Sequence, residues 1–481
     1  MNCSFRTQVS DCLSLRIEIP MRPIFILPSV VFISSCMLGP DPATPDLAVP
    51  SSFRGKTALH GPSFGDESWR KVFSDPNLRK LIAVAIQNNP DLVAATYRIE
   101  EARARTGIAN SAFFPTLDGS AGGTANSSSR NAGQSTASGD RSSESYNLTG
   151  LLSWELDLWG GIARDNQAAR ARLLKSEYQR DAVQTSLIAA VATAYIDLLN
   201  LDERLAISRN TVVSRKGSLD LVTARRDGGV SSDLEVGQAE ALLSQAKLFI
   251  PATERAIVER ENTIRVLLGA YPNSIERGGN LDRMDSAHGI AAGLPSAVMQ
   301  RRADIAAADQ SFQAATADIG VAEALRFPQL SLTGQGGVIS GDLNQLLQGG
   351  SAAYSIGPQL AGPIFDAGRS EYRVKAVQAT AQVALKEYQK VVLEAFREIS
   401  DALIAYQKTG EIIAEGTKLV VSQKSVSTIA TDRFQGGASS YLEVLDAERG
   451  LFTAELDLAD ARSNRLRAVV QAYRALGGGW K

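Results

Sequence analysis

The chain has 481 residues and a formal net charge of −2, and 44% of its residues are hydrophobic. This balance offers no basic excess for binding nucleic acid, and the apolar fraction is typical of an ordinary folded protein. The only histidines are His60 and His288, and all three cysteines, Cys3, Cys12 and Cys36, lie near the amino terminus. The body of the chain is therefore a poor candidate for metal clusters, disulfide frameworks or Cys/His nucleophile pairs.

The first 36 residues have the pattern of a targeting segment. After Met21 come an arginine, a short apolar stretch and the sequence Ile-Ser-Ser-Cys that ends at Cys36. This order resembles a bacterial lipoprotein signal, which is cut before a lipid-modified cysteine. We therefore expect residues 1–35 to be a signal with its true start at Met21, Cys36 to be acylated, and residues 36–68 to form a lipid-anchored tether. A plain secretory signal with an incidental cysteine is the alternative.

Helical periodicity begins after the tether. Residues 75–113 carry apolar positions at helical spacing, and Pro90 suits the first turn of a new helix. Residues 160–227 contain no proline, and apolar residues recur there in steps of four and three; these are Leu187, Val191, Ala194, Leu198, Leu201 and Leu205. A helix of about 68 residues would be about 100 Å long, which excludes a compact globular domain.

Two shorter helices are expected beside the long one, over residues 91–113 and 233–268. Their lengths, roughly 23 and 36 residues, nearly sum to that of the long helix at the same rise per residue. Stacked end to end, they could run antiparallel beside it. Each half of the chain is then predicted to be a two-stranded coiled coil.

Four segments alternate apolar and polar residues with the period of a strand. They cover residues 146–158, 329–338 and 354–364, with a weaker set that begins at Thr116. Ser/Gly/Asn-rich loops at 124–145 and 339–351 join them into one hairpin per half. Strands of about ten residues with one apolar face are typical of an outer-membrane barrel wall. Four strands cannot close a barrel, so several chains must share one; the edge of a soluble sandwich is the alternative.

The chain is an internal duplication. Residues 225–236 and 433–444 share eight of twelve positions at an offset of 208, while Phe114-Pro115 and Phe327-Pro328 are related by 213. The two offsets differ by five residues, and we expect this difference to arise from an insertion in the low-complexity stretch 124–145. We therefore divide the chain into a first repeat at 69–269 with its hairpin at about 114–158, a linker at 270–301, and a second repeat at 302–477 with its hairpin at about 328–364.

An ordered set of short motifs resembles the TolC-like outer membrane factor family, and specifically its lipoprotein (NodT-type) branch, which serves tripartite efflux pumps. The motifs span nearly all of the mature chain: Gly39-Pro40-Asp41 after Cys36, Asn89-Pro90-Asp91-Leu92, Leu294-Pro295-Ser296, Arg301-Arg302 with Asp304-Ile305, Phe327-Pro328, Phe365-Asp366 with Gly368-Arg369, and both Gly-Gly turns. Ala303, Pro42 and Gly161 depart from the family pattern at helix starts and in the tether.

The resemblance implies a mixed α and β homotrimer. Four strands per chain would make a twelve-stranded outer-membrane β-barrel, continued by a long periplasmic coiled-coil barrel of helices. The implied function is a passive export duct for drugs or other small toxic compounds, with no enzymatic activity, cofactor or metal. Its implied partners are outer membrane lipids, a periplasmic adaptor and an inner-membrane pump of the resistance-nodulation-division type, and not nucleic acid. The outer membrane duct of a one-step protein secretion system is the alternative function.

The resemblance also places the two Gly-Gly turns at the periplasmic mouth, where they would dock the adaptor. The docking residues would be Arg225, Gly228, Gly229, Ser231, Ser232, Arg433, Gly436, Gly437, Ser439 and Ser440. The periplasmic gate would use Arg433, Phe434, Glu443 and Asp446. We expect the glycines to supply positive φ angles and the four serines to cap the returning helices. The alternative for Glu443 and Asp446, as for Asp233 and Glu235, is that they are only charges at helix amino termini.

Overall fold

The computed structural model describes residues 37–54, 63–129, 142–279, 281 and 290–480, and within them the predicted duplication is confirmed element by element. The long helices α4 (Gly161–Asp227) and α9 (Arg369–Gln435) each have 67 residues. Their returning partners α5 (Asp233–Leu267) and α10 (Tyr441–Ala475) each have 35, and α3 (Pro90–Ser111) and α8 (Ala303–Ala324) each have 22. The described residues also include the short helices α1 (Trp69–Val72), α2 (Pro76–Asn88) and α7 (Pro295–Arg301).

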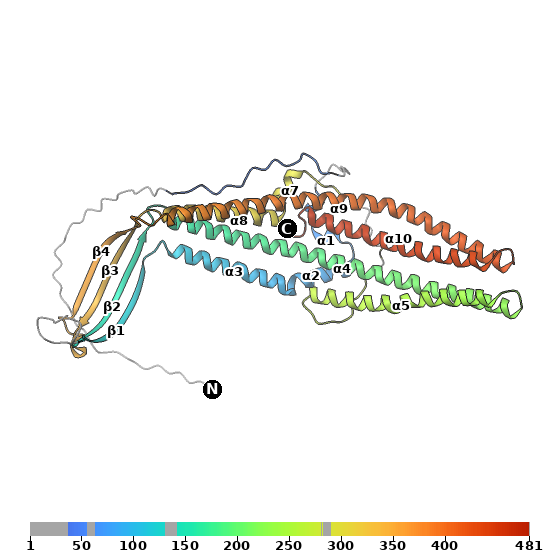
Figure 1. Cartoon of the computed structure of the whole chain (residues 1–481), viewed down its shortest axis with the longest axis horizontal. Coiled ribbons are helices and arrows are strands. Elements are labelled where there is room, and N and C mark those ends of the chain that lie inside the picture. Colours follow the sequence, from blue (N-terminus) through green and yellow to red (C-terminus); the bar gives the residue numbers. More distant parts are fainter. Residues whose placement is uncertain (1–36, 55–62, 130–141, 280, 282–289, 481) are drawn as a thin grey trace, which may run out of the picture. The chain divides into compact units, whose positions relative to one another are not determined.

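The expected end-to-end stacking of the shorter helices is also confirmed (Figure 1). In the first repeat, the Asn89 side chain caps α3 and its amide nitrogen donates to the carbonyl of Leu267, the last residue of α5, at 3.0 Å. In the second repeat, the guanidinium of Arg302 donates to the carbonyl of Ala475, the last residue of α10, at 3.1 Å. The same backbone arrangement is thus joined by an amide in one repeat and by a guanidinium in the other.

The two repeats do not form separate coiled coils. Helix α4 contacts α3 and α5 of its own repeat and also α8 and α10 of the second repeat, and α9 packs on the far side of α8 and α10. The apolar seam explains this double contact, because Leu187, Val191 and Leu198 are buried on α4. The prediction of a two-stranded coiled coil in each half is therefore too simple, since the shorter helices of the second repeat lie between the two long ones.

Helix α4 is the one helix among the described residues that is long and apolar enough to cross a membrane, but 56% of its apolar window is buried inside the protein. The largest core cluster among the described residues contains a run of α4 residues between Leu187 and Leu199. It includes Trp69, Leu78, Tyr195, Ile264 and Tyr473 from α1, α2, α4, α5 and α10. Packing within the protein therefore accounts for the apolarity of α4.

A four-stranded antiparallel sheet, in the order β1-β2-β3-β4, continues from the ends of α3, α4, α8 and α9 (Figure 1). Its strands are β1 (Thr116–Ser127), β2 (Ser142–Leu156), β3 (Gln329–Ser340) and β4 (Ala352–Ala361). The four predicted strands are thus confirmed. The loops are shorter than predicted, since Thr124 pairs with Ser145 inside the first hairpin, and strand β4 ends at Ala361 rather than at Ile364.

The register of the sheet collects apolar residues on one face. Leu117 lies opposite Leu152, Trp154 opposite Leu332, and Leu330 opposite Leu360. Tyr354, Ile356 and Leu360 are 89%, 70% and 65% exposed in the single chain. The other face carries Asp118, Asn147, Thr333, Gln335 and Gln359. One apolar and one polar face are what a barrel wall between lipid and a wet lumen requires.

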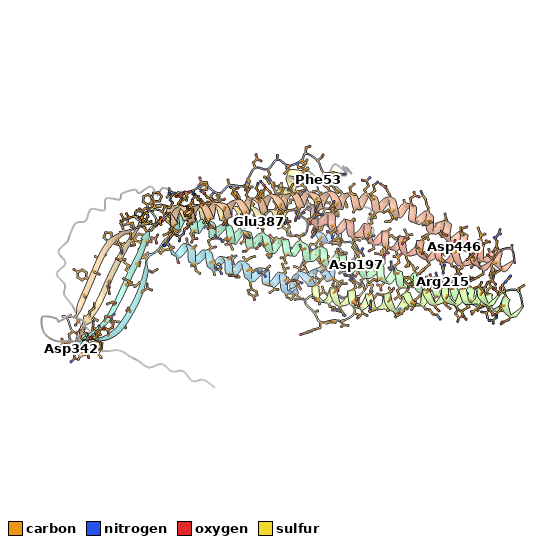
Figure 2. All side chains as sticks on the ribbon, in the orientation of Figure 1. Phe53, Asp197, Arg215, Asp342, Glu387 and Asp446 are labelled. Carbon is orange, nitrogen blue, oxygen red and sulfur yellow. The ribbon has the colours of Figure 1, made fainter. Side chains whose placement is uncertain are left out.

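The N-terminal strap, residues 37–54, lies against the helices. The Thr44 hydroxyl donates to Asp309 of α8 at 3.1 Å, Leu47 packs beside Tyr388 and Val392 of α9, and the ring of Phe53 lies 5.5 Å from that of Phe396. Figure 2 labels Phe53 on this strap. The described part of the predicted tether is therefore packed along the second repeat, whereas Cys36 and the signal lie outside the described residues.

Candidate functional site at the hairpin tips

The two hairpin turns have the same hydrogen-bonded geometry. After α4, the amide of Val230 donates to the carbonyl of Arg225 at 2.8 Å, and that of Gly229 donates to Arg226 at 2.8 Å. After α9, the amides of Ala438 and Gly437 donate to Arg433 and Phe434 at 2.8 and 3.1 Å. This is the Schellman motif, which ends a helix with one residue in the left-handed region.

Only the second glycine of each pair needs that conformation. Gly229 and Gly437 have φ of +78° and +73°, whereas Gly228 and Gly436 have −81° and −74°. The expectation of a positive φ is therefore confirmed for one glycine in each turn and is wrong for the other. No heavy atom lies within 4 Å of a β-carbon built at Gly229 or Gly437, so both turns present open backbone.

Serine capping occurs in the first turn only. The Ser232 hydroxyl accepts from the amide of Glu235 at 3.3 Å, and the Glu235 carboxylate accepts from the amide of Ser232 at 2.9 Å, which completes a capping box. Ser440 occupies the equivalent position before α10 without a side-chain cap bond. Ser231 and Ser439 precede the cap positions, and the buried hydroxyl of Ser439 has no partner among the described residues. The prediction of four capping serines is thus correct for Ser232 alone.

Phe434 lies in the core of the tip rather than on its surface. It is 3% exposed, and its ring lies 5.4 Å from that of Tyr441. The Arg225 guanidinium lies 4.6 Å above the Phe434 ring and donates to the carbonyl of Gln435 at 3.1 Å. Arg225 therefore joins the first turn to the second. Within one chain, Phe434 supports the wall of the tip, and the gating role that the resemblance implies for it stays a prediction.

The carboxylates of the second turn remain available. Glu443 and Asp446 are exposed on α10, and neither has an ion pair or side-chain hydrogen bond among the described residues. Figure 2 shows Asp446 close behind the tip. Glu235, which matches Glu443 in the first repeat, is held in the capping box, and Asp233 lies 3.8 Å from Arg226. Arg433 is exposed and donates to the carbonyl of Ala438 at 3.2 Å, which stabilises its own turn.

A buried polar cluster lies behind the tips, between α4, α5 and α10. The Arg215 guanidinium donates to the carbonyl of Leu242 at 2.7 Å and lies 5.1 Å from the ring of Phe452. The Ser218 hydroxyl donates to the Glu448 carboxylate at 2.5 Å. Burial lowers the pKa of Arg215 and raises that of Glu448. The sequence contained no local signal for this cluster, because Ser218 and Glu448, for example, are 230 residues apart.

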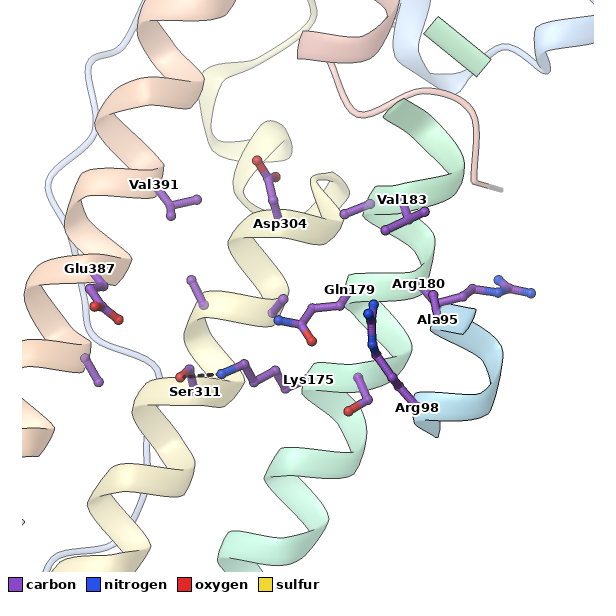
Figure 3. Close-up of a pocket in the computed structure, with 15 residues that line it drawn as sticks. Ala95, Arg98, Lys175, Gln179, Arg180, Val183, Asp304, Ser311, Glu387 and Val391 are labelled. Atoms are coloured by element: carbon purple, nitrogen blue, oxygen red, sulfur yellow. Dashed lines mark hydrogen bonds between the residues drawn. The ribbon is translucent and has the colours of Figure 1, made fainter. Parts of the chain in front are cut away.

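A second candidate is a cavity of about 690 Å³ between α3, α4, α8 and α9. Figure 3 shows Lys175, Gln179 and Ser311 at its centre, with the Lys175 ammonium donating to the Ser311 hydroxyl at 3.1 Å. Arg98 and Arg180 contribute positive charge, and Asp304 and Glu387 contribute negative charge. The described residues contain no group of three potential metal ligands.

Long helices behind an amphipathic four-stranded sheet define a channel-forming subunit. Comparison with known proteins then identifies the family. The family model described as outer membrane efflux protein matches residues 81–270 and 294–478, and the chain belongs to this family. It is therefore an outer membrane channel subunit of a tripartite efflux pump, with a periplasmic extension of helices.

The relatives agree along nearly their whole lengths. The solvent efflux pump outer membrane protein SrpC of Pseudomonas putida is 34% identical over 469 residues, which are 95% of this chain and 98% of that protein. The outer membrane protein OprJ of Pseudomonas aeruginosa is 33% identical over 452 residues, or 93% and 94% of the two chains.

Solved structures agree as well. The outer-membrane channel OprN has a TM-score of 0.85 at 31% identity, covering 92% of this chain and all of that one. The open MtrE channel of Neisseria gonorrhoeae has a TM-score of 0.82 at 29% identity, covering 93% and 99%. Channels of this fold are homotrimers, so three four-stranded sheets make the twelve-stranded barrel and the helices continue it into the periplasm.

Proposed function

We propose that this subunit is the export duct for small, largely apolar toxic compounds. Relatives are named for the efflux of solvents, toluene and antibiotics, and these names favour efflux over protein secretion. We further propose that an inner-membrane pump of the resistance-nodulation-division type supplies the energy and that a periplasmic adaptor joins it to the duct. The duct contributes a closed path and a gate, and no bond is made or broken in it.

The observation that carries the adaptor proposal is the pair of equivalent turns held together by Arg225. Gly229 and Gly437 leave the backbone of both turns open, and the Arg225 bond to Gln435 fixes one turn beside the other. A trimer would present six such turns around the periplasmic mouth. We propose that the adaptor docks on this ring through the two turns at Arg225–Ser232 and Arg433–Ser440.

The carboxylates of the second turn are the proposed gate. Three copies each of Glu443 and Asp446 would place six negative charges near the constriction. Neither side chain is engaged among the described residues of its own chain, so these charges would not be neutralised by neighbouring groups. Like charges this close in a narrow lumen attract cations and repel anions. Arg433 lies on the turn beside them, and Phe434 would act indirectly by holding the packing of the tip.

A pair of glycine variants tests the docking role. Gly437→Val places a β-branched residue at a φ of +73°, which costs roughly 1–2 kcal/mol or more of local strain. Gly436→Ala changes the neighbouring glycine, whose φ of −74° suits any residue. We expect Gly437→Val to weaken adaptor cross-linking and drug resistance while the trimer and barrel persist. Full resistance and normal cross-linking in Gly437→Val would contradict the docking role.

The attachment of the mature chain is tested at Cys36. We propose that the mature protein begins at Cys36 and that residues 36–68, 69–269, 270–301 and 302–477 are its tether, first repeat, linker and second repeat. Acyl chains contribute about 0.8 kcal/mol per buried methylene, and three anchors per trimer make retention nearly permanent. Cys36→Ser should therefore abolish acyl labelling. Mass spectrometry that finds an unmodified Cys36 at the mature terminus would exclude this attachment.

A further inference from the structure

One arginine of α4 is buried by the N-terminal strap. Arg164 is 1% exposed. Its Nε donates to the carbonyl of Leu38 at 2.9 Å, and its Nη2 donates to the carbonyl of Gly39 at 3.0 Å and to the Asp41 carboxylate at 2.9 Å. A buried charge is tolerated only when its hydrogen bonds are made. The guanidinium of Arg164 is therefore a binding site for residues 38–41.

Three glycines let the strap approach this closely. A β-carbon at Gly39, whose φ is +82°, would lie 2.5 Å from the α-carbon of Gly320. One at Gly320 would lie 2.6 Å from the carbonyl oxygen of Leu38, and one at Gly160 would lie 2.8 Å from the α-carbon of Met37. The amide of Leu38 also donates to the carbonyl of Trp159 at 3.2 Å. We call this arrangement of Arg164, Gly320 and the Trp159–Gly160 backbone the strap site.

The duplication provides an internal comparison. The second-repeat position that matches Arg164 is Tyr372, which is 67% exposed. The first-repeat position that matches Gly320 is Gly107, where a β-carbon would meet nothing within 4 Å. The backbone scaffold occurs twice, but the strap site occurs once, beside the single N-terminal strap. Repeat geometry alone therefore does not explain Arg164 or the close approach at Gly320.

A separate observation marks the level of the membrane surface. Aromatic residues lie at all four junctions between a helix and a strand: Phe113 and Phe114 before β1, Trp159 after β2, Phe327 before β3 and Phe365 after β4. Phe114 and Phe365 are 62% and 88% exposed, and Trp159 stacks on Phe327 at 4.8 Å. Such aromatic girdles lie at the interface between lipid and water. The strap site contains the backbone of Trp159 and thus lies at this level.

We propose that the strap site is a receptor for the chain's own mature N-terminus and fixes the acyl anchor at the periplasmic surface of the outer membrane. This inference rests on the proposed acylation of Cys36. With residues 38–41 bound, Met37 is held beside Gly160, and covalent geometry limits the α-carbon of the preceding residue to about 3.8 Å from that of Met37. Without the strap site, the first contact with the helices would be at Thr44, and eight extended residues reach about 27 Å. Arg164 is thus a positioning residue for the anchor.

Hydrogen exchange of the purified acylated trimer tests the binding step. The Leu38 amide should be protected in the parent, and Arg164→Gln should lower its protection by at least about tenfold, the factor expected for losing hydrogen bonds to a charged group. Arg172→Gln is the matched control, because Arg172 lies farther along α4 and pairs with Asp318 on the protein surface. Should Arg164→Gln fail to form trimers, Asp41→Asn removes the counter-charge without altering the helix. Equal Leu38 protection in parent and variants would overturn the proposal.

A photoactivatable fatty acid, incorporated metabolically, tests the positioning step. In the parent, cross-links from the acyl chain should concentrate near Trp159 and Phe327, and in Arg164→Gln they should become several-fold more dispersed. Dispersed cross-links in an acylated parent would contradict the positioning role alone. A parent chain that carries no label would contradict the acylation of Cys36, and the anchor proposal with it, even if the Leu38 amide remains protected.

Discussion

Removing the ring of Phe434 should open the hairpin tips. Phe434 is 3% exposed and packs with Val222, Tyr441 and Val444. Burying an aromatic side chain removes about 200 Å² from water, or about 5 kcal/mol at 25 cal/mol per Å². Measured losses for Phe→Ala in protein cores are about 3–5 kcal/mol. The contact with the Arg225 guanidinium adds roughly 0.5–1 kcal/mol, so we expect Phe434→Ala to destabilise the tip locally by about 3–5 kcal/mol.

Limited trypsin digestion of the detergent-solubilised trimer measures this opening, because Arg225, Arg226 and Arg433 lie on or next to the turns. A loss of 3–5 kcal/mol raises the open population by roughly a hundredfold to several thousandfold, since 1.4 kcal/mol is a factor of ten. Leu442→Ala is the control, because Leu442 is 61% exposed on the same hairpin. Phe434→Leu keeps part of the apolar volume and should lie between the two.

The opposite pattern would refute this reasoning. If Phe434→Ala resists trypsin like the parent but changes single-channel conductance, the ring faces the lumen of the trimer. Phe434 would then act in the gate itself, and the packing of the single chain would not describe the assembled mouth. Cleavage confined to the first turn would instead show that Arg225, rather than the aromatic ring, carries the coupling between the hairpins.

Three further predictions concern the same region. Ser232→Ala should destabilise the start of α5 by about 1 kcal/mol because it removes a capping box, whereas Ser440→Ala should barely change the stability at the start of α10. Amide hydrogen exchange in the first turns of α5 and α10 measures both effects. Equal losses of protection would contradict the difference in capping. The double variant Glu443→Gln, Asp446→Asn should reduce the channel's preference for cations in planar bilayers without weakening adaptor cross-linking. Conductance like that of the parent would contradict the gate proposal and show that the two carboxylates are only charges at a helix end. Burial raises the pKa of Glu448, so the folded state binds a proton more tightly than the unfolded state. The Glu448 contribution to stability is then fully present below the ordinary glutamate pKa and declines as pH rises through the raised one. Amide hydrogen exchange near Glu448, corrected for the pH dependence of the intrinsic exchange rate, should therefore be slower at about pH 5 than at about pH 7.5. Glu448→Gln should remove this difference between the two pH values.

The elements of the fold were predictable because each has a strong local period. The long helix expected at 160–227 is α4 at Gly161–Asp227, and the alternation from Tyr146 to Leu156 continues as one face of β2. The hairpin loops were less predictable, since the small and polar residues at 124–127 join the ladder where a partner strand pairs with them. Cross-strand pairing, and not intrinsic preference, decides the ends of such strands.

The site was predictable only where its chemistry is local. The positive φ of Gly437 follows from the turn that ends α9, but the burial of Phe434 depends on Val222 and Arg225, which are more than 200 residues away in the sequence. Arg164 had no signal at all, because its partners Leu38 and Asp41 are 126 and 123 residues away. Contacts between residues this far apart in the sequence depend on how distant segments of the chain pack together. The hydrophobic periodicity of a single segment does not predict them.

The duplication explains where such differences accumulate. Equal helix lengths in the two repeats allow six similar hairpins to close one ring in the trimer, so the backbone is constrained to remain symmetric. Side chains are not constrained in this way. Glu235 is held in a cap while Glu443 is free, and Arg164 binds the strap while Tyr372 faces outward. A role that is needed once per chain, such as the proposed binding of the N-terminus by Arg164, can therefore be assigned to one repeat without disturbing the scaffold that both repeats share.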